Sequence, residues 1–97
     1  MIKNILNEYD EEWAKSAALE LENIRYANKL TMTKFVDRIG IPYDRYYKYE
    51  KGNHMVPISV LKKVSLEFNE DYYEMLKRID SRVTVDIDPA NYLGEEK

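Results

Sequence analysis

The segment from Thr31 to Gly52 constrains the fold of this 97-residue chain more than any other, because it holds two helical patterns separated by a very short turn. The first pattern predicts a helix over 32–39 with four apolar side chains on one face: Met32, Phe35, Val36 and Ile39. Thr31 is the expected N-cap of this helix, Gly40 suits a left-handed helix end, and Pro42 suits the first turn of the next helix. Two short helices joined in this way cross at a large angle.

The helix after the turn is predicted to span residues 43–51 and to end at Gly52. Tyr46 and Tyr49 lie three residues apart, a spacing that places both side chains on the inward face of the helix. Glu50 is expected to cap or pair within the fold. The helix then stands out from the body as a rod that fits the major groove of B-DNA, which is about 12 Å wide.

Further helical patterns flank this pair of helices. Five side chains at helical spacing predict a short amphipathic N-terminal helix, or an extension that leads into the next helix: Ile2, Ile5, Leu6, Tyr9 and Trp13. The helical register continues from Ala14 to about Lys29. Two more helices are expected after Pro57 and after the N-cap residue Asp71, with Asn69 in a left-handed position between them.

The hydrophobic period changes near the C-terminus. Val83, Val85 and Ile87 alternate with polar residues, which predicts a short half-buried strand, and a polar tail follows over 88–97. We therefore expect an all-α chain with one short strand. Its expected parts are an amphipathic extension over 1–14, a helical domain over 15–80, and the strand with its tail over 81–97.

The composition excludes several classes of function. The chain has no cysteine and one histidine, His54, so thiolate metal sites, cysteine nucleophiles and zinc sites with several histidines are excluded. Its three glycines form no phosphate-binding loop, and no apolar run approaches the ~18–20 residues of a membrane span. Acidic residues stand where a signal peptide needs apolar ones. We therefore expect a cytoplasmic binding protein that is not an enzyme and holds no metal or cofactor.

The net charge of −3 conceals a segregation of charge along the chain. Residues 1–29 carry a net charge of −2 and residues 64–97 carry −5, whereas residues 30–63 have seven basic and three acidic side chains and carry +4. Because salt screens charges beyond about 8–10 Å, the local face decides what binds. The middle of the chain is therefore the candidate anion-binding face.

The string TMTKFVDRIGIPYDRYYKYEKG resembles the phage-repressor and Cro-like helix-turn-helix family, which includes the XRE-type transcriptional regulators. The resemblance covers residues 18–79 and depends on Ile39 with Gly40 at the turn, Glu50 with Gly52 after the second helix, and Pro57 before the fourth. It implies a five-helix, lambda-repressor-like domain that binds double-stranded DNA.

The resemblance also implies which residues would contact DNA. Tyr43, Asp44 and Lys48 match the positions from which family members read bases. Lys48 could donate to guanine, Tyr43 could pack on a thymine methyl group, and Asp44 could accept from cytosine or serve only to stabilise the start of its helix. Six further residues are candidates for phosphate contacts: Lys34, Arg45, Tyr47, Lys51, Asn53 and His54.

A single small DNA reader contacts one half-site, so we expect a homodimer on a palindromic operator, acting as a repressor. The predicted strand, through Val83, Val85 and Ile87, could pair with its twin across a two-fold axis, and the amphipathic N-terminus is the other candidate interface. The alternative function is protein binding, as in an antitoxin or a phage-encoded inhibitor. Met32 and Val36, where the family has glutamine and alanine, favour that alternative, as do Asp44 and the acidic flanks.

Overall fold

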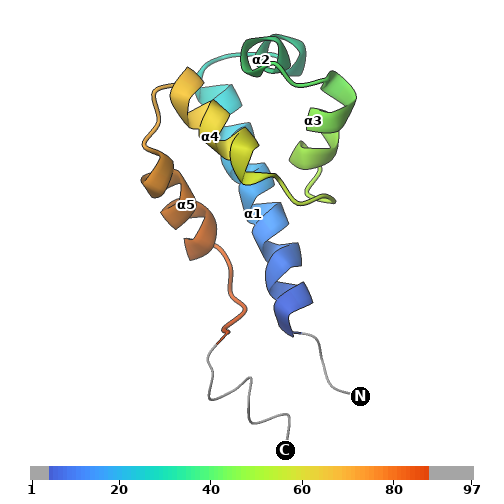
Figure 1. Ribbon diagram of the computed structural model, residues 1–97, viewed down its shortest axis with the longest axis vertical. Helices are drawn as coiled ribbons and strands as arrows, with labels where there is room; N and C mark the ends of the chain where they lie inside the picture. The colour runs from blue at the N-terminus through green and yellow to red at the C-terminus, as the bar shows by residue number, and fades with distance from the viewer. Residues whose placement is uncertain (1–4, 88–97) are drawn as a thin grey trace, which may run out of the picture.

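The computed structural model describes residues 5–87, and this part of the chain folds into five helices. The helices are α1 (Ile5–Ala27), α2 (Met32–Ile39), α3 (Tyr43–Glu50), α4 (Ile58–Glu67) and α5 (Tyr72–Ser81). Figure 1 shows α1 along the length of the molecule. α2 lies across the C-terminal end of α1, and α3 and α5 lie on opposite sides of α1. The all-α fold expected from the sequence is therefore confirmed.

The ends of the shorter helices follow the expected local chemistry. The Thr31 hydroxyl accepts a hydrogen bond from the backbone N–H of Lys34 at 3.3 Å, and the Asp71 carboxylate accepts one from Glu74 at 3.0 Å. Both contacts satisfy N–H groups that the first turn of a helix leaves unpaired. Gly40 and Asn69 have φ values of 71° and 54°, the left-handed conformation that ends α2 and α4.

The hydrophobic core lies where all five helices meet, around the ring of Phe35. This ring stacks on Phe68, with ring centres 4.8 Å apart, and lies 5.1 Å from the ring of Tyr46. Tyr46 and Tyr49 are both buried, as their spacing predicted. Together they fix the inner face of α3 to the rest of the domain.

The loop after α3 packs closely against α1, where the side chain of Ala18 is small. Gly52 has a φ of 77°, and a Cβ atom built on it would lie 3.4 Å from the Cα of Lys15 and 3.7 Å from the Cβ of Ala18. These are ordinary van der Waals distances, so it is the left-handed backbone conformation that favours glycine at this position.

The N-terminal segment is the extension that leads into the next helix, rather than a separate short helix. α1 runs without interruption from Ile5 to Ala27, so the expected boundary between residues 14 and 15 falls inside it. Ile2 of the amphipathic N-terminus and the polar tail over 88–97 lie outside the described residues. The division of the chain into three parts stays a prediction.

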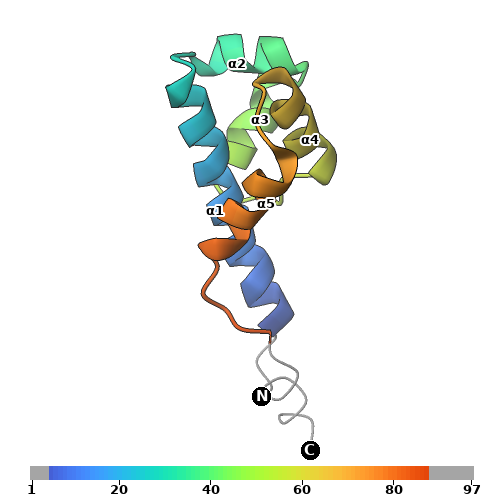
Figure 2. The same ribbon diagram turned by 90° about the vertical axis from the view of Figure 1, so that its left-hand side faces the viewer.

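The strand expected from Val83, Val85 and Ile87 is not formed in the described part of the chain. This segment runs instead beside the N-terminal half of α1 (Figures 1 and 2), where the N–H and the hydroxyl of Thr84 donate to the Glu12 carboxylate at 2.8 and 2.9 Å. An alternating pattern reports that one face is buried, but a strand also needs a partner for its backbone groups. Here a helix covers the segment, and no described strand lies beside it.

A buried carboxylate joins α1 to α5. Glu20 accepts hydrogen bonds from Arg78 at 2.8 Å and from Arg82 at 2.9 Å, and Arg78 also donates to Glu70 at 3.0 Å. The hydrogen bond to Glu20 raises the pKa of Arg78 above its ordinary value. Nearby, the Tyr9 hydroxyl donates to Asp80, which raises the pKa of Tyr9 to about 12.

Candidate nucleic-acid interface

The turn between α2 and α3 sets the direction in which α3 leaves the body. The backbone N–H groups of Gly40 and Ile41 both donate to the carbonyl oxygen of Val36, at 2.8 and 3.2 Å. These two bonds close the end of α2 in the manner of a left-handed helix cap. Pro42 follows and starts α3 without a side-chain cap.

The inner face of α3 is anchored by its last turn as well as by its tyrosines. Glu50 accepts two hydrogen bonds from Arg25 of α1, from Nε at 2.9 Å and from Nη2 at 3.0 Å. These bonds raise the pKa of Arg25 above its already high ordinary value. The expectation that Glu50 pairs within the fold is therefore confirmed, whereas its partner in α1 could not be predicted from local spacing.

The Tyr46 hydroxyl lies close to this ion pair. It is fully buried, and no hydrogen bond of ordinary geometry joins it to the described residues, although the Glu50 carboxylate lies near enough to act on it. Burial raises the pKa of Tyr46, and the neighbouring Glu50 carboxylate raises it further, so the phenol stays neutral.

The outer face of α3 carries all the residues that were predicted to touch DNA from this helix. They are exposed, and none forms an ion pair with the described residues: Tyr43, Asp44, Arg45, Tyr47 and Lys48. Tyr43 stacks on Tyr47 with ring centres 6.3 Å apart, and the Lys51 Nζ lies 5.0 Å from the centre of the Tyr47 ring. This arrangement forms one stripe along α3 with aromatic and basic character.

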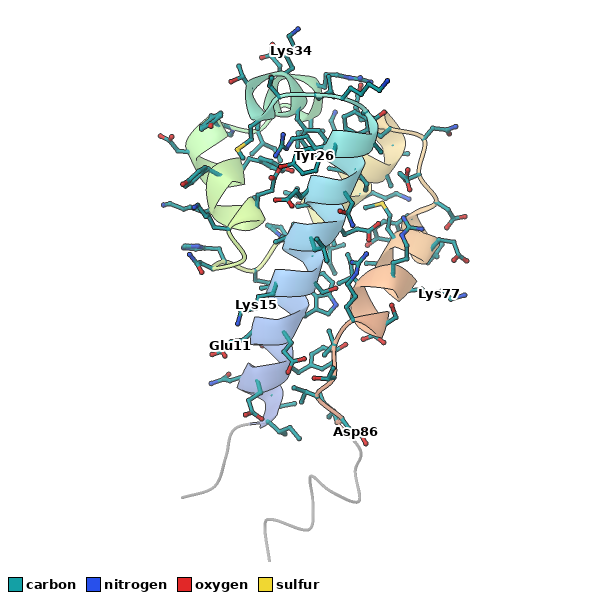
Figure 3. All side chains as sticks on the ribbon, turned by 180° about the vertical axis from the view of Figure 1, so that it is seen from behind. Glu11, Lys15, Tyr26, Lys34, Lys77 and Asp86 are labelled. Carbon is teal, nitrogen blue, oxygen red and sulfur yellow. The ribbon has the colours of Figure 1, made fainter. Side chains whose placement is uncertain are left out.

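The remaining phosphate candidates lie on α2 and in the loop that follows α3. Lys34 is exposed on α2 and points outward from the end of the molecule that α2 covers (Figure 3). Lys51 continues the stripe of α3, and His54 is exposed in the loop that follows. Asn53 lines a hollow beside Asp10 and therefore lies toward α1 rather than on the stripe.

The structure also brings to this region residues that were not predicted for it. A hollow of about 240 Å³ lies between the end of α1 and the stripe, and its walls include Glu22, Tyr26, Met32 and Tyr47. Tyr26 is exposed, and the Arg25 guanidinium lies 4.6 Å from the centre of its ring. The spacing of apolar residues along α1 did not predict a role for Tyr26, because that spacing identifies buried side chains and Tyr26 is exposed.

No group of three or more His, Asp or Glu side chains in the described residues could hold a metal ion, and none of the described helices is long and apolar enough to span a membrane. The protruding helix is α3, and its exposed side-chain donors can hydrogen-bond to base edges or phosphates.

Comparisons with known proteins place this arrangement in a family. The model of the helix-turn-helix domain matches residues 20–81, a stretch that begins in α1 and ends with α5. Comparison with curated proteins and with solved structures gave no match. Since the matched stretch covers more than half of the chain and includes α2, the turn and α3, the chain belongs to the helix-turn-helix domain family.

Proposed function

We propose that this protein is a Cro-like, XRE-type transcriptional regulator that binds double-stranded DNA and inserts α3 into the major groove. The observation that carries the proposal is the division of α3 into two faces. Tyr46, Tyr49 and Glu50 fix the inner face, while Arg45 and Lys48 remain exposed on the outer face without ion-pair partners in the described chain. Family membership supports the same class of function.

In this proposal the outer residues of α3 have separate roles. Lys48 donates to guanine O6 or N7, and Tyr43 packs on a thymine methyl group. Asp44 accepts from cytosine N4 or stabilises the free N–H groups of the first turn of α3. Phosphates bind to the cations and donors around the helix, which are Lys34, Arg45, Tyr47, Lys51, Asn53 and His54.

We propose a homodimer on a palindromic operator, because one copy of α3 spans only one half-site. The segment of Val83, Val85 and Ile87 remains one candidate for its interface. A dimer bound at an operator blocks other proteins from the same duplex, so we propose repression.

Selection from random duplexes, followed by a salt titration on the selected site, tests this function. If each monomer neutralises about four phosphates, the logarithm of the binding constant falls with the logarithm of salt concentration with a slope of about −3 to −4 per monomer. Absence of binding to any duplex at about 50 mM salt would contradict the proposal, because electrostatic attraction is strong there.

Protein binding is the second candidate function, and Asp44 is the observation that favours it. This carboxylate is exposed on the outer face of α3, beside the residues that would face phosphate. An antitoxin or inhibitor would use the same protruding helix to bind a protein surface, with Asp44 facing a cation of the partner. The duplex selection separates the two functions, because this candidate predicts no enrichment of any DNA sequence.

A further inference from the structure

Two exposed tyrosines wall the hollow between the end of α1 and the stripe of α3. Tyr26 of α1 is 59% exposed and Tyr47 of α3 is 41% exposed, and both line this hollow together with Lys51. Figure 3 shows Tyr26 at the same end of the molecule as Lys34, which is a candidate phosphate contact. The hollow therefore lies beside the surface that would face DNA.

The side chain of Tyr26 is positioned by Arg25, which is itself buried. The Arg25 guanidinium lies 4.6 Å from the centre of the Tyr26 ring, and Glu50 fixes that guanidinium through two hydrogen bonds of 2.9 and 3.0 Å. After Glu50, the Tyr26 oxygen also helps to raise the pKa of Arg25, so this oxygen lies near the guanidinium. Because a guanidinium only donates, this contact leaves the O–H of Tyr26 available as a donor.

The charges around the hollow nearly cancel. Arg25 and Glu50 form an ion pair, whereas Lys51 contributes one positive charge and Glu22 contributes one negative charge. Neither Lys51 nor Glu22 forms an ion pair with the described residues. A phosphate here would be attracted by Lys51 and repelled by Glu22, so its binding depends on an uncharged donor. Met32, which also lines the hollow, has no such donor in its side chain.

We propose that Tyr26 is a phosphate-binding residue of the DNA interface. Its hydroxyl donates to one phosphate of the duplex backbone, and the Lys51 ammonium attracts the same phosphate. The inference rests on the proposed DNA binding and adds α1 to an interface that otherwise consists of α2, α3 and the loop after α3. Because Tyr26 lies outside the helix that would enter the major groove, its contact positions the protein along the backbone and carries no base preference.

Fluorescence anisotropy with the selected duplex, and with a duplex of unrelated sequence, tests this contact. Tyr26→Phe removes only the hydroxyl and is expected to weaken binding to both duplexes about three- to tenfold per half-site, because one exposed hydrogen bond is lost. Its salt slope should stay unchanged, whereas Lys51→Ala should reduce the slope by about 1 per monomer. Tyr73→Phe is the matched control, because Tyr73 is 72% exposed on α5, across α1 from α3.

Glu22 provides a test of the opposite sign. Glu22→Gln is expected to tighten binding to both duplexes about three- to fivefold at low salt, because it removes the carboxylate that repels the phosphate. Glu74→Gln removes the same charge from α5 and should change binding by less than about twofold, since salt screens a distant charge. Circular dichroism checks that every variant is folded.

Replacement of single phosphates by uncharged methylphosphonate locates the contact. At one phosphate of each half-site, Tyr26→Phe should have no further effect after the replacement, because both changes remove the same hydrogen bond.

Four outcomes would overturn the role of Tyr26: unchanged affinity in Tyr26→Phe, a loss confined to one base pair, no tightening in Glu22→Gln, or no phosphate that is coupled to Tyr26. A chain that binds the duplex but gives any of these results contradicts only this role. A chain that binds no duplex contradicts the proposed DNA-binding function as well.

Discussion

Arg25 of α1 holds Glu50 of α3 through two hydrogen bonds, of 2.9 and 3.0 Å, in a pair that is almost completely shielded from water. The two side chains are only 10% and 4% exposed. Arg25 also donates to the carbonyl oxygen of Leu30 at 3.1 Å, just before α2 begins. One side chain therefore connects α1, the start of the helix-turn-helix unit and the end of α3.

Removal of one member of this pair should destabilise the whole domain. We expect Arg25→Ala to lower the free energy of unfolding by about 3–5 kcal/mol, because the Glu50 carboxylate is then left buried without a partner. Urea denaturation followed by circular dichroism measures this loss. Lys77→Ala is the matched control, because its ion pair with Glu74 is exposed and should contribute under about 1 kcal/mol. Equal effects of the two substitutions would contradict this account of the buried pair.

Lys48 gives the most direct test of base reading by α3. Lys48→Ala should cost about 1–3 kcal/mol on the selected site and relax the preference at one base pair, because a donor to guanine is lost. Fluorescence anisotropy with single-base variants of the site measures both effects. An equal loss on every sequence would instead assign Lys48 to a phosphate, and Lys77→Ala, far from α3, should leave affinity unchanged.

The buried hydroxyl of Tyr46 leads to a prediction about the stability of the core. Tyr46→Phe should leave the free energy of unfolding unchanged or raise it by about 1–2 kcal/mol, because it removes a buried polar atom that forms no hydrogen bond with the described residues. Tyr9→Phe is the contrasting control, since its hydroxyl donates to Asp80 and its loss should cost about 0.5–1.5 kcal/mol. Calorimetry of both variants measures these changes in stability. A clear loss of stability in Tyr46→Phe would show that the hydroxyl of Tyr46 forms a hydrogen bond in the unmodified protein.

The contact between Glu12 and the C-terminal segment should depend on pH. Hydrogen bonds from the N–H and hydroxyl of Thr84 hold the pKa of Glu12 below its ordinary value of 4.5. The contact is therefore at full strength above about pH 4.5 and is lost as pH falls through the lower pKa of the folded state. The NMR shift of the Thr84 amide should follow this titration, and Glu12→Gln should abolish it. A Thr84 amide that titrates equally in both proteins would contradict the contact.

Local chemistry made much of the fold predictable. Thr31 and Asp71 start helices through side-chain caps, and Gly40 and Asn69 end helices through a left-handed backbone. The sequence predicted these ends because each effect reaches only a few residues along the chain. The burial of Tyr46 and the exposure of the other side of α3 follow from helical periodicity in the same way.

Contacts between distant parts of the chain were not predictable by such reasoning. Glu20 meets Arg78 and Arg82 across 58 and 62 residues, and nothing in the local pattern distinguishes these three charges from solvated ones. The expected strand at Val83 and Val85 was wrong for a related reason, since alternation reports a buried face without identifying the element that buries it. The same limit applies to the hollow beside Trp13, whose walls come from α1 and from the segment around Met55 and Ile58.

The two-faced character of α3 has a consequence for how proteins of this design can change. Substitutions at its outward positions leave the anchoring contacts of the inner face untouched, so new target preferences can arise at little cost in folding free energy. Selectivity and thermodynamic robustness are thus encoded by separate residues of one eight-residue helix. The outward positions of this helix can be changed by engineering while Arg25, on its inner side, keeps the helix in place.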